Sequence, residues 1–248
     1  AAFIVAGISA YKVMKGDNSK ATKSAMNVGV IVAAILIPVQ IFIGDASGLL
    51  VLKHQPDKLA AIEAIWETEQ PAALTLFAIP NNETRSNDFP IAIPHLGSLI
   101  LTHSWDGEIK GLNEFDVHPP VAPVFFSFRV MVGIGFLMLF ASWVGVYQLW
   151  RKKELSPWMH KLLFGMTFSG WIAVVAGWYV TEIGRQPWIV YGLLKTSDAV
   201  APHGPTVMIT SLTMYIILYA FLLVSYLSVL FYMTNKTIKN NIAAAKGA

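Results

Sequence analysis

Four long runs of the sequence contain almost no charged residue, and these runs limit the fold more than any other feature. About 20 consecutive apolar residues are enough for a helix to cross the hydrocarbon core of a bilayer. Arg129 is the one charged residue in the four runs, which are Ala25–Ile43, Val121–Leu149, Leu162–Val180 and Val207–Met233. The sequence therefore predicts four transmembrane helices.

Composition supports a membrane protein over a soluble one. Charged residues make up 13% of the chain, whereas they make up about a quarter of a typical soluble domain. The absence of cysteine excludes disulfides, thiolate metal sites and cysteine-held iron–sulfur clusters. The basic residues lie beside the apolar runs, which favours a lipid bilayer and no nucleic acid as the partner.

The opening segment, Ala1–Met14, is apolar but too short to cross a bilayer. A helix that starts inside hydrocarbon would leave its backbone groups without partners. We therefore expect this segment to be the end of a further helix whose beginning lies upstream. The predicted fold class is an all-α integral membrane bundle with four complete transmembrane helices plus the end of a fifth.

Lysine and arginine predict the orientation of the bundle, because such residues gather on the cytoplasmic side. If each apolar run crosses once, all the clusters fall on one side. They are residues 12–23, residues 151–161 and the C-terminal tail from residue 236. That side is predicted to be cytoplasmic, and residues 45–120 are then an outer segment between two membrane regions, residues 1–44 and 121–248.

The outer segment is too long for an ordinary connection, and loops of this length are usually functional or disordered. Within it, Leu59, Ile62 and Trp66 follow helical spacing in Asp57–Glu67. We expect a short amphipathic helix on the outer membrane face or on the protein, within an otherwise irregular loop. On this helix Lys58 and Glu63 could hydrogen-bond a quinone oxygen and take protons from a quinol. From spacing alone, a solvated helix face is a more frequent explanation of Lys58 and Glu63 than a role in quinol binding.

Two membrane segments carry ionisable residues, which are costly there and often functional. The first is GWYVTEIGRQPW, in which Trp178 and Glu182 lie four residues apart on one helix face and Arg185 follows. From spacing alone, Glu182 and Arg185 are equally well explained as an interfacial ion pair that anchors a helix end and as part of a functional site. The second is FRVM, where Arg129 requires an anion such as a haem propionate. Met131 is either an axial haem ligand or an ordinary core side chain.

None of the six histidines lies in the middle of an apolar run. A haem protein in the bilayer usually has at least one histidine there. By its residues alone, the chain is therefore not a self-contained haem protein.

The motifs together resemble subunit I of cytochrome bd quinol oxidases. The resemblance rests on GRQPW after a GW-x-x-x-E segment, on FRVMVGIGF, on KLAAIEAIWET, and on GDASG and GISAYKVMKG. They occur in the order found in that family and cover essentially the whole chain. The short outer segment is typical of the branch with a short quinol loop.

The resemblance implies a haem-bearing subunit of the bacterial plasma membrane that oxidises quinol on the outer side and reduces dioxygen to water. The cofactors would be two haems b and one haem d or a third b-type haem. Partners would be ubiquinol or menaquinol, dioxygen, a second large membrane subunit, a small single-helix subunit and the N-terminal part of subunit I. The family's histidine ligands belong to that N-terminal part.

The resemblance also implies a role for each motif residue. Met131 would be an axial ligand of the low-spin haem b, with Arg129 as its electrostatic partner through a propionate. Glu182 would be an axial ligand of the high-spin haem b. Trp178 would pack between haems, while Arg185 and Trp188 would hold the outer end of that site. Lys58 and Glu63 would be the quinol-loop pair, with Glu63 handling protons.

Two other functions are kept open. A haem-free transporter or channel subunit would also place Arg and Glu in the membrane, although it would be expected to have broken helices or inverted repeats, and neither is evident in the sequence. The second alternative is a degenerate subunit that only scaffolds an oxidase. Haem binding when the chain is co-expressed with its N-terminal half would distinguish the enzyme subunit from such a scaffold.

Overall fold

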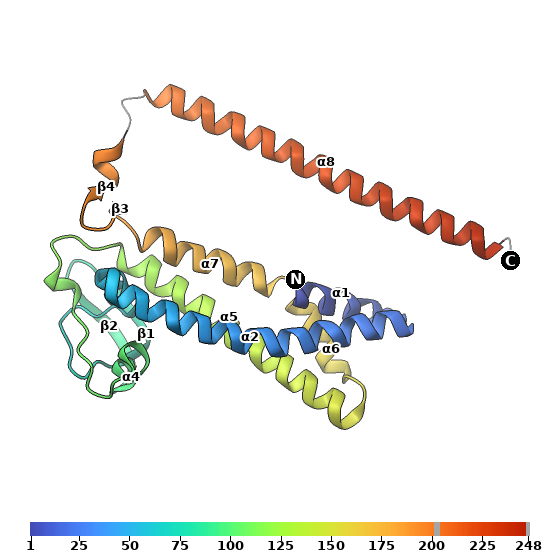
Figure 1. Cartoon of the computed structure of the whole chain (residues 1–248), viewed down its shortest axis with the longest axis horizontal. Coiled ribbons are helices and arrows are strands. Elements are labelled where there is room, and N and C mark those ends of the chain that lie inside the picture. Colours follow the sequence, from blue (N-terminus) through green and yellow to red (C-terminus); the bar gives the residue numbers. More distant parts are fainter. Residues whose placement is uncertain (201–203, 247–248) are drawn as a thin grey trace. The chain divides into compact units, whose positions relative to one another are not determined.

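The computed structural model describes residues 1–200 and 204–246, and it gives side chains in the last helix for residues 204–229 and 232. The chain divides into two compact units, residues 1–199 and 200–248. Four helical segments are long and apolar enough to cross a membrane, namely Lys20–His54, Val121–Lys152, Pro157–Ile183 and Pro205–Val229. They coincide with the four predicted transmembrane helices, so the predicted fold class is confirmed (Figure 1).

The elements of the first unit alternate between long helices and a compact outer region. The helices are α1 (Ala2–Met14), α2 (Lys20–His54), α3 (Pro56–Glu63), α4 (Leu96–Thr102), α5 (Val121–Lys152), α6 (Pro157–Gly165) and α7 (Ser169–Ile183). The strands are β1 (Leu74–Asn81), β2 (Ser86–Ile93), β3 (Trp188–Val190) and β4 (Leu194–Lys195). Two 3-10 turns complete it, η1 (Leu112–Glu114) and η2 (Thr196–Ala199).

The predicted cytoplasmic ends of the helices meet at one end of the first unit. There α1 packs against α2 and α6, and α2 packs against α5. Their shared core contains Phe3, Met26, Val30, Met159 and Leu163. Lys23, in the first turn of α2, forms an ion pair with Glu154, which follows the end of α5. The distance between Lys23 Nζ and Glu154 Oε1 is 3.1 Å. The basic clusters of residues 12–23 and 151–161 therefore lie on the same side, as the charge pattern predicted.

The third span differs from the prediction of one uninterrupted helix. It is broken between Gly165 and Ser169, so that α6 packs on α1 while α7 packs on α5. Non-helical backbone at membrane depth needs other hydrogen-bond partners. Here the Thr167 hydroxyl donates to the Phe164 carbonyl at 2.6 Å and the Ser169 hydroxyl to the Met166 carbonyl at 2.8 Å. This run of glycine, serine and threonine is a poor helix former, which explains the break.

The outer segment contains more regular structure than the predicted loop. Helix α2 continues to His54, beyond the predicted end of its span, and Asp45 on it pairs with His103 at 3.1 Å. Strands β1 and β2 form an antiparallel hairpin at the same end as α4, opposite the α1–α2 turn (Figure 1). The apolar run Leu74–Ile79, followed by Pro80 and two asparagines, is a signal of a strand that ends in a turn, and this hairpin was not predicted.

The amphipathic helix of the outer segment is present but shorter and more buried than predicted. Helix α3 ends at Glu63 because Ala64 adopts a left-handed conformation, with φ of 54°. Trp66 lies beyond the helix but is still buried in the core, as Leu59 and Ile62 are. All residues from Asp57 to Glu63 are buried, so α3 packs within the protein, against α2 and α5.

The second unit contains α8 (Pro205–Lys246), which includes the fourth predicted transmembrane helix. Residues 201–203, with His203, and residues 247–248 at the end of the predicted third region lie outside the described residues. The side chains of the tail lysines lie outside them as well.

Candidate functional site

Two of the predicted residues on α3 reach the neighbouring helices: Glu63 meets Arg129 on α5, and Lys58 reaches the end of α7. Helix α3 starts at Pro56, a residue whose missing N–H suits the first helical turn. A second core holds it against both long helices, with Ala60, Ala61, Phe125 and Val180 among its buried residues. The outer segment is thereby fixed against the two helices that carry the other predicted residues.

Arg129 is held by protein acceptors on every N–H group it has. An arginine side chain carries five N–H donors, and each has a partner here. The acceptors are the carbonyls of Ile62 (2.7 Å), Phe125 (3.2 Å), Leu76 (3.2 Å) and Thr75, and the Glu63 carboxylate (3.1 Å). The guanidinium carbon also lies 3.3 Å from the centre of the Phe125 ring. A haem propionate as its partner stays a prediction, and such a contact requires one of these bonds to be exchanged.

Glu63 is the anion that the sequence required for Arg129. Its side chain is 2% exposed, and Oε2 lies 3.1 Å from Arg129 Nη2. Burial raises the pKa of this carboxyl above its ordinary value, and the positive charge of Arg129 opposes that rise. A solvated helix face, which spacing alone favoured, is wrong for Glu63 and equally wrong for Lys58, because both are buried.

Lys58 faces the end of α7 rather than Glu63. Its Nζ donates to the Thr181 carbonyl at 3.4 Å. A Cβ on Gly184 would lie 3.1 Å from Lys58 Cε, so the missing side chain leaves room for the lysine stem. Burial lowers the pKa of Lys58, the charge of Arg185 lowers it further, and the charge of Glu182 opposes both.

The end of α7 exposes its ionisable pair. Glu182 and Arg185 form an ion pair across three residues, and their side chains are 54% and 45% exposed. Trp178, one turn earlier on α7, is 68% exposed. The Glu182 carboxylate and the Trp178 indole are thus accessible to a bound group or to another subunit. The Glu–Arg pair that could anchor a helix end is also present.

Met131 lies in the contact between α5 and α7. Its sulfur would be 3.0 Å from a Cβ on Gly177, so the glycine allows the thioether to lie directly against α7. Met131 is half-buried, and the close approach of helices at small residues is common in membranes. Met131 and Arg129, two residues apart, accordingly contact different elements.

Trp188 begins the β3–β4 hairpin that follows α7. Its ring centre lies 5.9 Å from that of Tyr191 and 5.4 Å from Lys195 Nζ. Burial, and then the charge of Asp57 at the start of α3, raise the pKa of Tyr191 to about 12. Sequence reasoning missed both Asp57 and Tyr191, because no local spacing connects residues that far apart in the chain.

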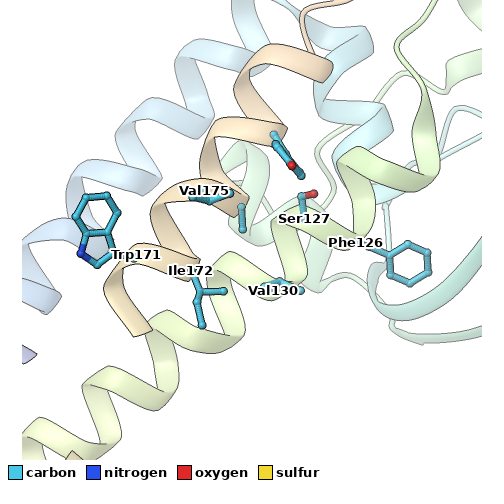
Figure 2. Close-up of a pocket in the computed structure, with 8 residues that line it drawn as sticks. Phe126, Ser127, Val130, Trp171, Ile172 and Val175 are labelled. Atoms are coloured by element: carbon cyan, nitrogen blue, oxygen red, sulfur yellow. The ribbon is translucent and has the colours of Figure 1, made fainter. Parts of the chain in front are cut away.

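A groove of about 460 Å³ opens between α5 and α7. Figure 2 shows Ser127 and Val130 on α5 beside Ile172 and Val175 on α7. The lining is almost entirely apolar and contains none of the eight predicted site residues. The groove therefore offers a hydrocarbon-like surface and no chemistry of its own.

The structure thus brings Glu63 and Arg129 together, and Lys58 together with the Glu182 end of α7. Among the residues described (1–200 and 204–246), no group of three His, Asp or Glu side chains is placed to hold a metal ion.

Comparison with known proteins gives consistent matches. A family model described as "Cytochrome bd terminal oxidase subunit I" matches residues 1–238. The "Cytochrome bd ubiquinol oxidase subunit 1" of Bacillus subtilis (strain 168) is 33% identical over 215 residues, which cover 82% of this chain and 46% of that protein. The "Cytochrome bd-II ubiquinol oxidase subunit 1" of Escherichia coli (strain K12) is 28% identical, and the match covers 90% of this chain and 57% of that protein.

A solved structure, that of the bd oxidase from Geobacillus thermodenitrificans, matches with a TM-score of 0.81 and 32% sequence identity. The match covers 95% of this chain and 54% of the other. The chain spans about half the length of the curated relatives it matches.

Proposed function

Because the chain belongs to the cytochrome bd oxidase subunit I family, we propose that it is part of the haem-bearing subunit of a quinol oxidase. The complete enzyme would oxidise ubiquinol or menaquinol at the outer membrane face and reduce dioxygen to water. A second large membrane subunit, a small single-helix subunit and the remainder of subunit I would complete the complex in the plasma membrane.

The observation that carries this proposal is the buried Glu63–Arg129 pair. It joins α3 of the outer segment to α5, two residues before Met131. A carboxyl whose pKa is raised by burial exchanges protons closer to neutral pH than an exposed one does. Glu63 is therefore suited to accept a proton from a quinol hydroxyl as a carboxylate, which the neighbouring Arg129 stabilises, and to become the neutral acid.

Lys58 would bind the quinol rather than take its protons. It is a hydrogen-bond donor with one weak, 3.4 Å contact to Thr181, so a quinone oxygen could replace that contact at little cost. Lysine presents donors and no acceptor, which suits it to the carbonyl oxygen of the product. Lys58 and Glu63 would then contribute to one quinol site from the same short helix.

The donor chemistry of two residues fits haem. The half-buried thioether of Met131 is a known type of axial ligand, and Glu182 presents an exposed carboxylate at the end of α7. Each would supply one ligand, with Trp178, Arg185 and Trp188 around the Glu182 end and any histidine ligand coming from outside this chain. Bound haems, two of b type and one of d or b type, would supply the one-electron and dioxygen chemistry that side chains cannot.

The broken third span is the one observation that favours a haem-free transporter instead. Transporters use unwound helices to coordinate ions at the midplane. In this chain, however, the break from Phe164 to Gly170 contains no charged residue, and the Thr167 and Ser169 hydroxyls bond to the freed carbonyls. The break therefore serves packing better than ion binding.

The proposal is tested by oxygen consumption of membranes that contain the complete complex, with quinol as the electron donor. Glu63→Gln should lower the rate about 100-fold or more, because general acid–base groups contribute about 10²- to 10⁴-fold, and the haem content should be retained. Glu83→Gln, which alters an exposed carboxyl at the hairpin turn, is the control. Equal rates for the two variants would overturn the role of Glu63.

A further inference from the structure

Asn87 of strand β2 links the outer hairpin to the segment that follows α3. Its side-chain Nδ2 donates to the Ala64 carbonyl at 2.8 Å, and its Oδ1 accepts from the Trp66 indole Nε1 at 3.0 Å. Because an indole N–H only donates and a carbonyl only accepts, one orientation of the amide satisfies both bonds. Ala64 and Trp66 are both buried, so the amide takes the place that water would have at an exposed turn.

Ala64 is the residue at which α3 ends. It has φ of 54° and ψ of 42°, a left-handed conformation that is unfavourable for a residue with a side chain. Such a conformation persists where the surrounding structure holds it. Asn87 holds it at the Ala64 carbonyl, and the Ile65 N–H closes the turn by donating to the Ala60 carbonyl at 2.9 Å.

Glu63 is the last residue of α3, so the turn that follows it sets where the carboxylate lies. Its Oε2 is 3.1 Å from Arg129 Nη2. Arg129 also donates to the carbonyls of Thr75 and Leu76 on β1. The hairpin therefore holds both members of the ion pair, Arg129 through β1 and the end of α3 through Asn87 on β2.

The two ends of α3 are held by different elements. At the start of the helix, Lys58 Nζ donates to the Thr181 carbonyl of α7 at 3.4 Å. At the end of the helix, the residue after Glu63 is held by Asn87 of β2. A change at Asn87 should therefore disturb the proposed proton acceptor and leave the support of the proposed quinol-binding lysine intact.

We propose that Asn87 is a positioning residue for quinol oxidation, which acts by holding the turn at Ala64 and thereby keeping the Glu63 carboxylate against Arg129. This role rests on the proposed function, because it assumes that Glu63 accepts a proton from quinol. Asn87 acts through Glu63 and touches neither quinol nor haem.

The test measures kcat and KM for a short-chain quinol by oxygen consumption of the complete membrane complex. Asn87→Leu keeps a side chain of similar shape and removes both hydrogen bonds. It should lower kcat about 10- to 100-fold, because displacing a catalytic group by about 1 Å can cost about 100-fold. KM should stay near the wild-type value, since Lys58 keeps its own support, and the dithionite-reduced haem spectrum should not change. Asn82→Leu, at the exposed hairpin turn, is the matched control.

A second variant keeps the test decisive if Asn87→Leu fails to assemble. Asn87→Asp retains an acceptor for the Trp66 indole but has no donor for the Ala64 carbonyl. Its kcat should fall as that of Asn87→Leu does, because the Ala64 bond is the one that holds the turn. A wild-type kcat in Asn87→Asp would overturn the positioning role, and Asn82→Asp controls for the added charge.

A double-mutant cycle shows whether Asn87 acts through Glu63. In a Glu63→Gln background, Asn87→Leu should have no further effect on kcat, because residues that act through one another are not additive. Full additivity, a raised KM with unchanged kcat, or a loss of haem together with activity would overturn the proposal.

The same measurements separate the two levels of the proposal. A wild-type complex without quinol-dependent oxygen consumption, or a Glu63→Gln complex with the wild-type rate, would contradict the proposed function itself. A slow Glu63→Gln complex beside an Asn87→Leu complex with the wild-type kcat would contradict the positioning role alone.

Discussion

Arg129 bonds to α3, β1 and its own helix through its five N–H groups, so several elements of the outer region depend on one side chain. Removing one member of a buried ion pair leaves the other charge without compensation, which costs about 3–5 kcal/mol. Arg129→Gln should therefore lower the thermal stability of the purified complex far more than Arg151→Gln, which alters an exposed arginine. Adding Glu63→Gln to Arg129→Gln should restore part of the loss. Equal stability of the two single variants would contradict the importance of the pair.

The pH dependence of stability should reveal the buried carboxyl of Glu63. Its pKa in the folded chain lies above the ordinary value of 4.5, so the protonated form favours folding. That contribution is fully present below pH 4.5 and is lost as the pH rises through the folded-state pKa. Against Glu63→Gln, which does not titrate, the wild-type complex should become less stable as the pH is raised above 4.5. Melting temperatures across that range test this, and a constant difference between the two proteins would argue against it.

Met131 is predicted to be a haem ligand, and a spectrum tests that role directly. Leucine fills a similar volume to methionine but has no sulfur to bind iron. Met131→Leu in the complete complex should abolish the spectrum of the low-spin haem b, whereas Met138→Leu, seven residues further along α5, should leave it intact. An unchanged reduced-minus-oxidised spectrum for Met131→Leu would remove Met131 from the ligand set.

The break between α6 and α7 allows the two halves of one span to pack on different helices. Gly7 of α1 lies at this break, and a Cβ there would overlap Thr167 Oγ1 and lie 2.7 Å from the Leu163 carbonyl. Overpacking of this kind costs about 1–3 kcal/mol. Gly7→Ala should therefore reduce the yield and melting temperature of the assembled complex. Gly133→Ala, where nothing lies within 4 Å, should not, and a tolerated Gly7→Ala would show that α1 and α6 can move apart.

The long helices could be predicted from the sequence because length and hydrophobicity alone decide whether a helix crosses a membrane. The break at Thr167 could not, because glycine, serine and threonine also occur within unbroken transmembrane helices. The β1–β2 hairpin was missed although its asparagine turn gives a local signal. The burial of Lys58 and Glu63 depends on which helices cover α3, and that is decided by contacts far apart in the sequence.

The same limit applies within the site. The need of Arg129 for an anion was predictable, since a charge in an apolar run is costly, but Glu63 as that anion was not. Lys58 and Thr181 come together only because α3 and the end of α7 lie at the same end of the bundle. Ligand roles for Met131 and Glu182 follow from residue type and family membership, and they stay predictions.

The chain as a whole combines one predicted cytoplasmic end, rich in lysine and arginine, with an outer end that holds the buried acid, the lysine and the Glu182 pair. This polarity is consistent with the proposal that quinol is oxidised at the outer end. Many side chains along its spans are exposed and apolar, among them Phe42, Phe140, Trp143 and Trp171. Such surfaces are compatible with lipid and with the further subunits expected in the complete complex.

We propose above that this chain belongs to a haem complex that quinol reduces. A quinol-reduced minus oxidised absorption spectrum, recorded without oxygen on the detergent-extracted native complex that contains this chain, tests that proposal. We expect b-type haem bands, together with a far-red band if the third haem is of d type, and Glu63→Gln should slow their appearance after quinol is added. A complex with no haem bands, or with haem that dithionite reduces and quinol does not, would show that the proposal is wrong.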